Sequence, residues 1–123
     1  MATQLATGFM AVAKASALAS GAMMSVKVGG EEILLARVGD KIYAASNICP
    51  HMGGHLATGK LEGTIVTCPR HHSQFDLTDG HNIRWTDWTG AMLTFAKIFR
   101  APRALKTYPA KVEGDDIMVK VEK

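Results

Sequence analysis

The only two cysteines of this chain lie in short segments that could bind a metal. Cys49 is followed two positions later by His51, and Cys68 three positions later by His71. Each segment therefore offers one thiolate and one neutral imidazole. This donor set suits a site with two chemically different irons, in which one iron takes both sulfurs and the other both imidazoles. A structural zinc site is the competing interpretation, although paired zinc ligands are usually separated by about two to four residues. Cys49 and His51 are separated by one.

The residues around the four donors form a wider pattern. It consists of Pro50, Met52 and Gly53 beside the first pair, Pro69 and Arg70 inside the second, Leu56 and Gly59 after the first segment, and Phe75, Asp76 and Gly80 after the second. This pattern resembles the signature of the Rieske family, and the similarity extends over the flanking segments from about residue 9 to residue 121. The resemblance implies one [2Fe–2S] cluster per chain, bound by the two cysteines and by His51 and His71.

Differences from the family's high-potential members indicate a branch of the family. Gly54 and Arg70 stand where the Rieske proteins of cytochrome bc complexes carry two further cysteines joined as a disulfide. Phe75 stands where those proteins have a tyrosine whose hydroxyl bonds a ligand sulfur. Both differences resemble the low-potential, ferredoxin-like branch, whereas Ser73 occupies the place of a hydroxyl donor typical of the high-potential one. We therefore expect a potential near the low end of the Rieske range of about −150 to +300 mV, raised somewhat by Ser73.

Short apolar runs separated by glycine turns must position these segments. The expected strands are residues 9–13, 26–28, 33–38, 42–45, 110–112 and 117–121, with turns at Gly29-Gly30, Gly39-Asp40 and Gly114-Asp115. Such a pattern is typical of successive antiparallel hairpins. We expect a single all-β domain over residues 1–123, an antiparallel barrel or sandwich of the Rieske type. The cluster-binding subdomain is expected as an insertion at about residues 46–80.

A second insertion is expected at about residues 82–100. Within it, polar positions recur at Thr94, Lys97 and Arg100, and this spacing predicts one short helix over residues 89–100. The apolar side chains around those positions need a surface to cover them. Both a cap on the barrel and a homo-oligomer or partner interface are consistent with the segment.

Composition narrows the functional classes. The chain has 123 residues and a net charge of only +3, which does not favour nucleic acid as a partner. The apolar first 24 residues have no basic start and no apolar run long enough to cross a membrane. Neither cysteine is left over for a structural disulfide, which favours a reducing cytoplasm. We therefore expect a soluble, cytoplasmic protein without a membrane or nucleic-acid partner.

The family resemblance implies an electron carrier rather than an enzyme. A Rieske ferredoxin carries single electrons from a flavoprotein reductase to a terminal oxygenase that hydroxylates aromatic rings. Catalytic oxygenase subunits add a mononuclear iron bound by two histidines and a carboxylate. His55 and His72 are expected as exposed loop residues, which leaves only His81 beyond the cluster segments. The alternative is a Rieske small subunit of a larger oxidoreductase such as a nitrite reductase. A subunit of a quinol-oxidising complex ranks last because the disulfide and a membrane anchor are missing.

Overall fold

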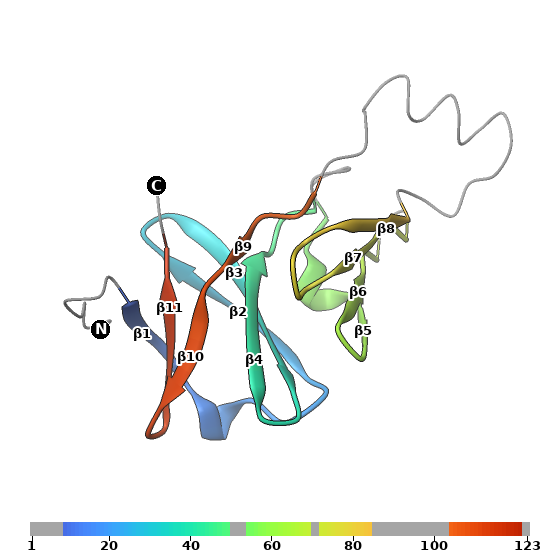
Figure 1. Ribbon diagram of the computed structural model, residues 1–123. Coiled ribbons are helices and arrows are strands. Elements are labelled where there is room, and N and C mark those ends of the chain that lie inside the picture. The colour runs from blue at the N-terminus through green and yellow to red at the C-terminus, as the bar shows by residue number, and fades with distance from the viewer. Residues whose placement is uncertain (1–8, 50–53, 70–71, 85–103, 122–123) are drawn as a thin grey trace, which may run out of the picture.

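The computed structural model describes residues 9–49, 54–69, 72–84 and 104–121. Within these residues the chain forms eleven strands in three sheets and two short 3-10 helices (Figure 1). The strands are β1 (Phe9–Lys14), β2 (Met23–Val28), β3 (Glu31–Val38), β4 (Lys41–Ser46), β5 (Lys60–Glu62), β6 (Ile65–Thr67), β7 (Gln74–Asp76), β8 (Asn82–Arg84), β9 (Thr107–Tyr108), β10 (Ala110–Glu113) and β11 (Asp116–Lys120). The helices are η1 (Ala15–Ala17) and η2 (Leu56–Thr58). The predicted all-β architecture is confirmed.

Two of the sheets are built from the beginning and the end of the chain. One has the strand order β1-β11-β10, and the other the order β2-β3-β4-β9. All neighbouring strands are antiparallel, and tight turns join β2 to β3 and β3 to β4. Gly29 and Gly30 have φ angles of 57° and 86°, the left-handed values that a two-residue hairpin turn of this kind requires. The predicted hairpins are therefore present, with their turns at the predicted glycines.

The central strand β3 is buried on both faces. Its run Ile33–Ala36 has no exposed surface. Side chains alternate along a strand, so Ile33 and Leu35 face one way and pack in a cluster with Ile117 and Val119. Leu34 and Ala36 face the opposite way and pack in a second cluster, which contains Cys49 and Cys68. The β2-β3-β4-β9 sheet thus separates two apolar cores, and the cysteines belong to the second.

The third sheet covers this second core. It has the order β5-β6-β7-β8, and it lies beside β4, on the side away from β1 and β11 (Figure 1). Val66 of β6 and Phe75 of β7 pair across the sheet, and both side chains are fully buried in the apolar cluster that contains the cysteines. Both cysteine segments connect to this sheet. The first precedes β5, and the second joins β6 to β7.

The predicted helix over residues 89–100 lies outside the described residues, as does the oligomer interface suggested for it. In the part of the chain that the structure describes, no helix is long and apolar enough to cross a bilayer.

Candidate metal centre

The first cysteine segment leaves the end of β4 and returns as η2. Cys49 N–H donates to the carbonyl oxygen of Gly54 at 2.8 Å, and Ile48 forms an isolated antiparallel bridge with His55. Leu56 N–H then donates to the carbonyl oxygen of Asn47, also at 2.8 Å. These contacts close the segment into a loop with a narrow neck. Its tip, residues 50–53, lies outside the described residues and includes the expected ligand His51.

The second cysteine segment connects β6 to β7 as the loop of a hairpin. Thr67 pairs with Gln74 at the last rung of the hairpin, and the Gln74 side-chain amide donates to the Thr67 hydroxyl at 3.2 Å. Cys68 N–H donates to the carbonyl oxygen of Ser73 at 2.8 Å, and His72 N–H to that of Cys68 at 3.1 Å. His72 has a φ of 60°, an uncommon left-handed conformation for a residue other than glycine. The expected ligand His71 lies outside the described residues.

The two loops place their cysteines in the same way. Each cysteine N–H donates across its own loop, to Gly54 in the first and to Ser73 in the second, over the same number of residues and at the same 2.8 Å. Both cysteines are only 2% exposed, and both belong to one apolar cluster. No disulfide joins them. The fold therefore brings together two sulfurs that are 19 positions apart in the sequence.

Gly59 shows how closely the two loops approach each other. A Cβ atom at this position would lie 2.0 Å from the carbonyl oxygen of Thr67 and 3.1 Å from Cδ of Pro69. Thr67 and Pro69 flank Cys68, so the backbone after the first loop lies directly against the start of the second. Only glycine allows this contact. This explains physically why Gly59 belongs to the pattern noted in the sequence.

Two polar residues are buried among the described residues, and both adjoin the ligand loops. Ser73 has no exposed surface and follows the second loop, and Asn47 is 2% exposed and precedes the first. Ser73 was expected from the family resemblance. Asn47 was not, because an asparagine at the end of a strand reads as an ordinary turn residue. Phe75 is fully buried in the same cluster as both cysteines, and it brings no hydroxyl to that core.

A capped turn follows β7, at the end of that strand opposite the second loop. Thr78 donates to Asp76 Oδ1 through its backbone N–H at 2.9 Å and through its hydroxyl at 2.7 Å. These two hydrogen bonds favour the charged carboxylate and hold the pKa of Asp76 below its usual value. Gly80 follows with a φ of 82°, and its carbonyl oxygen accepts from Leu105 N–H at 2.8 Å. Leu105 is buried with the cysteines, so the returning chain closes the same core.

The remaining histidines do not point to another ligand set. His55 and His72 are exposed, as predicted, and His55 Nδ1 lies 3.5 Å from Glu32. His81 is exposed. Its backbone N–H donates to Asp79 Oδ1 at 3.0 Å and its Nδ1 lies 2.5 Å from the same oxygen, and these contacts, the backbone one first, lower the pKa of that carboxyl. Among the described residues, no group of three or more His, Cys, Asp and Glu side chains converges as a metal site.

The described part of the site fits an iron–sulfur cluster. A thiolate surrounded by apolar side chains has lost its hydration, so it needs a compensating cation. Two buried cysteines held by matching loops meet this need when one iron takes both sulfurs. A cavity of about 500 Å³ opens beside Cys68, lined by the segments 58–60 and 67–69 and by Glu62, His72 and Gln74. Residues that follow the first loop therefore share the wall of this cavity with residues of the second loop.

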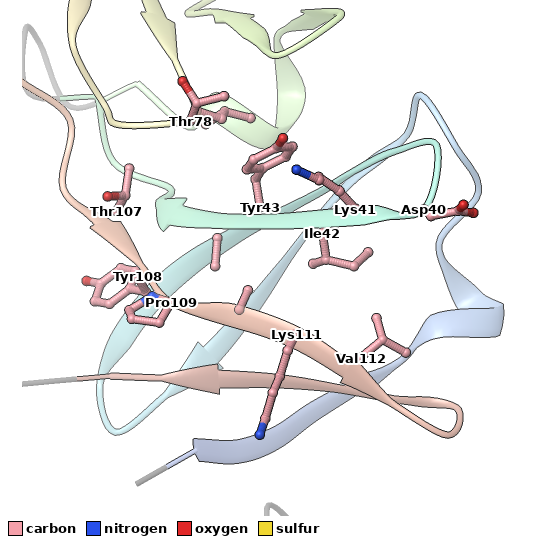
Figure 2. A pocket seen from close by; sticks show the side chains of 13 residues that line it. Asp40, Lys41, Ile42, Tyr43, Thr78, Thr107, Tyr108, Pro109, Lys111 and Val112 are labelled. Atoms are coloured by element: carbon pink, nitrogen blue, oxygen red, sulfur yellow. The ribbon is translucent and has the colours of Figure 1, made fainter. Parts of the chain in front are cut away.

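A separate cavity of about 630 Å³ lies away from the cysteines, between β4 and β10 (Figure 2). It forms because β9 pairs with β4 only through Ala44 and Ala45, after which Pro109 interrupts the ladder and β10 pairs with β11. Figure 2 shows Tyr43 pointing from β4 toward Thr78 on the turn above. Burial raises the pKa of Tyr108 in its wall. This cavity marks a change of sheet and contains none of the expected ligands.

Comparison with known proteins decides the family. A model of the Rieske [2Fe–2S] domain matches residues 8–109. The chain belongs to the Rieske [2Fe–2S] domain family. The ferredoxin component of the naphthalene 1,2-dioxygenase/salicylate 5-hydroxylase systems of a Ralstonia species is 35% identical over 102 residues, covering 83% of this chain and 85% of the relative. The ferredoxin component of biphenyl 2,3-dioxygenase from Rhodococcus jostii is 32% identical over 105 residues, covering 85% of each chain.

A solved structure agrees with this assignment. The ferredoxin of carbazole 1,9a-dioxygenase from Nocardioides aromaticivorans superposes with a TM-score of 0.74 at 26% identity, covering 91% of this Rieske chain and 96% of the ferredoxin. The cofactor is therefore a Rieske-type [2Fe–2S] cluster. Ferredoxin components carry electrons and do not transform substrate themselves, and this Rieske protein is of that kind.

Proposed function

We propose that this Rieske protein passes single electrons from a flavoprotein reductase to a terminal oxygenase that hydroxylates aromatic rings. The observation that carries the proposal is the pair of matching loops that deliver Cys49 and Cys68 into one buried cluster. The relatives named above support the same role, since their names assign them to naphthalene, salicylate and biphenyl oxygenation systems. No nucleic acid and no membrane enters this scheme.

In this proposal the two cysteines bind one iron, and His51 and His71 bind the other. The cluster supplies a centre that gains and loses one electron. Cys49 and Cys68 supply the negative charge, and the apolar side chains around them exclude water. Ser73, completely buried after the second loop, is proposed as a hydroxyl donor to the cluster. The hydrogen-bonded loop necks would limit movement of Cys49 and Cys68 when the cluster changes its oxidation state.

The same proposal covers the organisation and location of the protein. We propose one domain over residues 1–123, with residues 46–80 as the cluster-binding subdomain and residues 82–100 as an insertion. The separate β5-β6-β7-β8 sheet supports the subdomain, and its last strand includes residues 82–84. A cytoplasmic location is proposed because a reducing compartment keeps both cysteines available to iron. Self-association through residues 89–100 remains part of the proposal.

Electron paramagnetic resonance (EPR) of the dithionite-reduced protein tests the cofactor and its ligands. We expect a signal with an average g value below that of four-cysteine [2Fe–2S] clusters, because two imidazoles replace two thiolates. His51→Ala and His71→Ala should remove this signal. His55→Ala and His72→Ala are matched controls, since these exposed neighbours should leave it unchanged. An average g value equal to that of four-cysteine clusters would contradict the proposal, as would a normal signal in either ligand variant.

Electron transfer itself is tested by stopped-flow absorbance. The oxidised protein should be reduced by a flavoprotein reductase of an aromatic-ring dioxygenase system and reoxidised by the terminal oxygenase of that system. If neither partner exchanged electrons with a protein that shows the expected EPR signal, the carrier role would be wrong. The alternative of a small subunit held in a larger oxidoreductase would then gain support.

A further inference from the structure

The neck of the first ligand loop differs from that of the second in how it is closed. The second loop is the end of a hairpin, so the β6–β7 ladder holds its two sides together. The first loop joins the strand β4 to the 3-10 helix η2, and these two elements do not form a ladder with each other. The first neck is closed by the single Ile48–His55 bridge and by individual hydrogen bonds rather than by a ladder.

The start of η2 leaves backbone donors that the helix cannot satisfy. Thr58 N–H bonds the His55 carbonyl oxygen at 3.1 Å, and Gly59 N–H bonds that of Leu56 at 2.9 Å. The two preceding N–H groups, of Leu56 and Ala57, have no acceptor within the turn, as is usual for the first residues of a helix. His55 occupies the N-cap position but its side chain makes no capping hydrogen bond.

Asn47 satisfies both of these donors from the opposite side of the loop. Its carbonyl oxygen accepts from Leu56 N–H, and its side-chain Oδ1 accepts from Ala57 N–H, both at 2.8 Å. Asn47 N–H in turn donates to the carbonyl oxygen of Glu32 in β3 at 2.9 Å. One residue thus connects the return of the ligand loop to the strand that is buried on both faces.

Burial makes these bonds consequential. Asn47 is 2% exposed and Leu56 has no exposed surface, so water cannot easily replace a lost acceptor. Leu56 packs in the same cluster as Cys49 and Cys68. A displacement of η2 would therefore act on the core that surrounds both sulfurs.

We propose that Asn47 is a positioning residue for the cluster: its side chain caps η2 across the first ligand loop and so holds Cys49 in place. The Ile48–His55 bridge and the Cys49–Gly54 hydrogen bond also close this neck, and Asn47 adds two buried hydrogen bonds that tie it to η2. The inference rests on the proposed ligand role of Cys49.

Three variants test the inference. Asn47→Ala removes the acceptor for Ala57 N–H, and Asn47→Asp keeps an oxygen at the same place and should restore the bond. Val119→Ala is the control, because Val119 is fully buried in the other core, which contains neither cysteine. Hydrogen–deuterium exchange of a peptide covering residues 54–61 reports on the neck, and a peptide from β3 reports on the whole fold.

We expect Asn47→Ala to accelerate exchange of the 54–61 peptide about tenfold relative to the β3 peptide, the effect of one buried hydrogen bond. Its EPR lines should broaden, because Cys49 then occupies more than one arrangement, and iron should be lost about tenfold faster. Asn47→Asp should restore the exchange rate, and Val119→Ala should change both peptides together while leaving the EPR lines narrow.

Three results would overturn the inference. The first is an Asn47→Ala protein with wild-type EPR lines and wild-type exchange of the 54–61 peptide. The second is broadening of the EPR lines in Val119→Ala to the same extent. The third result applies if Asn47→Ala does not fold, in which case Asn47→Asp becomes the test. An exchange rate of its 54–61 peptide far above the wild-type rate, relative to the β3 peptide, would overturn the inference. Loss of the Rieske signal in the wild-type protein would instead refute the proposed function.

Discussion

Gly59→Ala directly tests the close approach of the two ligand loops. The new Cβ atom would lie 2.0 Å from the Thr67 carbonyl oxygen, whereas contacts below 3.0 Å essentially never occur for real Cβ atoms. The backbone must therefore separate by about 1 Å. Thr67 directly precedes Cys68 and is paired on both sides, with Lys60 and Gln74, so the sheet resists this movement. Overpacking of this kind typically costs about 1–3 kcal/mol, and a contact between two backbone segments belongs at the upper end.

Gly63→Ala, in the turn between β5 and β6 of the same sheet, is the matched control. Gly63 has a φ of 59° and no atom within 4 Å of an added Cβ, so alanine there should cost only the left-handed backbone strain, about 1 kcal/mol. The difference of about 2 kcal/mol corresponds to a roughly 30-fold faster loss of the cluster for Gly59→Ala. The assay follows the decay of the visible cluster absorbance at a fixed urea concentration, together with iron content and EPR line shape. Cluster lifetimes within twofold of each other in the two variants would refute the reasoning.

Two further predictions concern the potential and the pH dependence. Phe75→Tyr places a hydroxyl in the core beside the cysteines and should raise the midpoint potential by at most about 50 mV, the equivalent of one hydrogen bond, while Ser73→Ala should lower it by a similar amount in protein-film voltammetry. Midpoint potentials unchanged in both variants would show that a hydroxyl at neither position donates a hydrogen bond to the cluster or its ligand sulfurs. The lowered pKa of Asp76 implies stability that is present above its unfolded value of about 3.8 and lost as the pH falls through the lower folded value. Thr78→Val keeps the backbone N–H donor, the larger cause of the shift, and removes the hydroxyl donor. It should weaken the pH dependence of the free energy of unfolding, measured by urea titration below about pH 4, by less than about 1 kcal/mol after solvent screening; an unchanged pH dependence would contradict this.

The sequence predicted the elements whose signals are local. Glycine pairs at residues 29–30 and single glycines at 39 and 114 marked the hairpin turns, because left-handed backbone favours glycine wherever it occurs. The apolar run Ile33–Ala36 marked a strand, although its burial on both faces became evident only from the packing. The donor types at Cys49 and Cys68 indicated an iron–sulfur site, since thiolates and imidazoles are chosen by the metal's own chemistry.

The tertiary structure decided what lies between segments that are distant in sequence. Nothing in the residues around Asn47 predicts that it caps a helix on the far side of the loop, because that bond depends on where η2 returns. The requirement for glycine at position 59 likewise arises from the carbonyl oxygen of Thr67, which only the packed sheet brings within reach. The sequence by itself thus predicted which residues bind the cluster, and it located six of the eleven strands, β1–β4, β10 and β11. Only the folded chain determined how rigidly those residues are held, because rigidity comes from long-range contacts that no local pattern records.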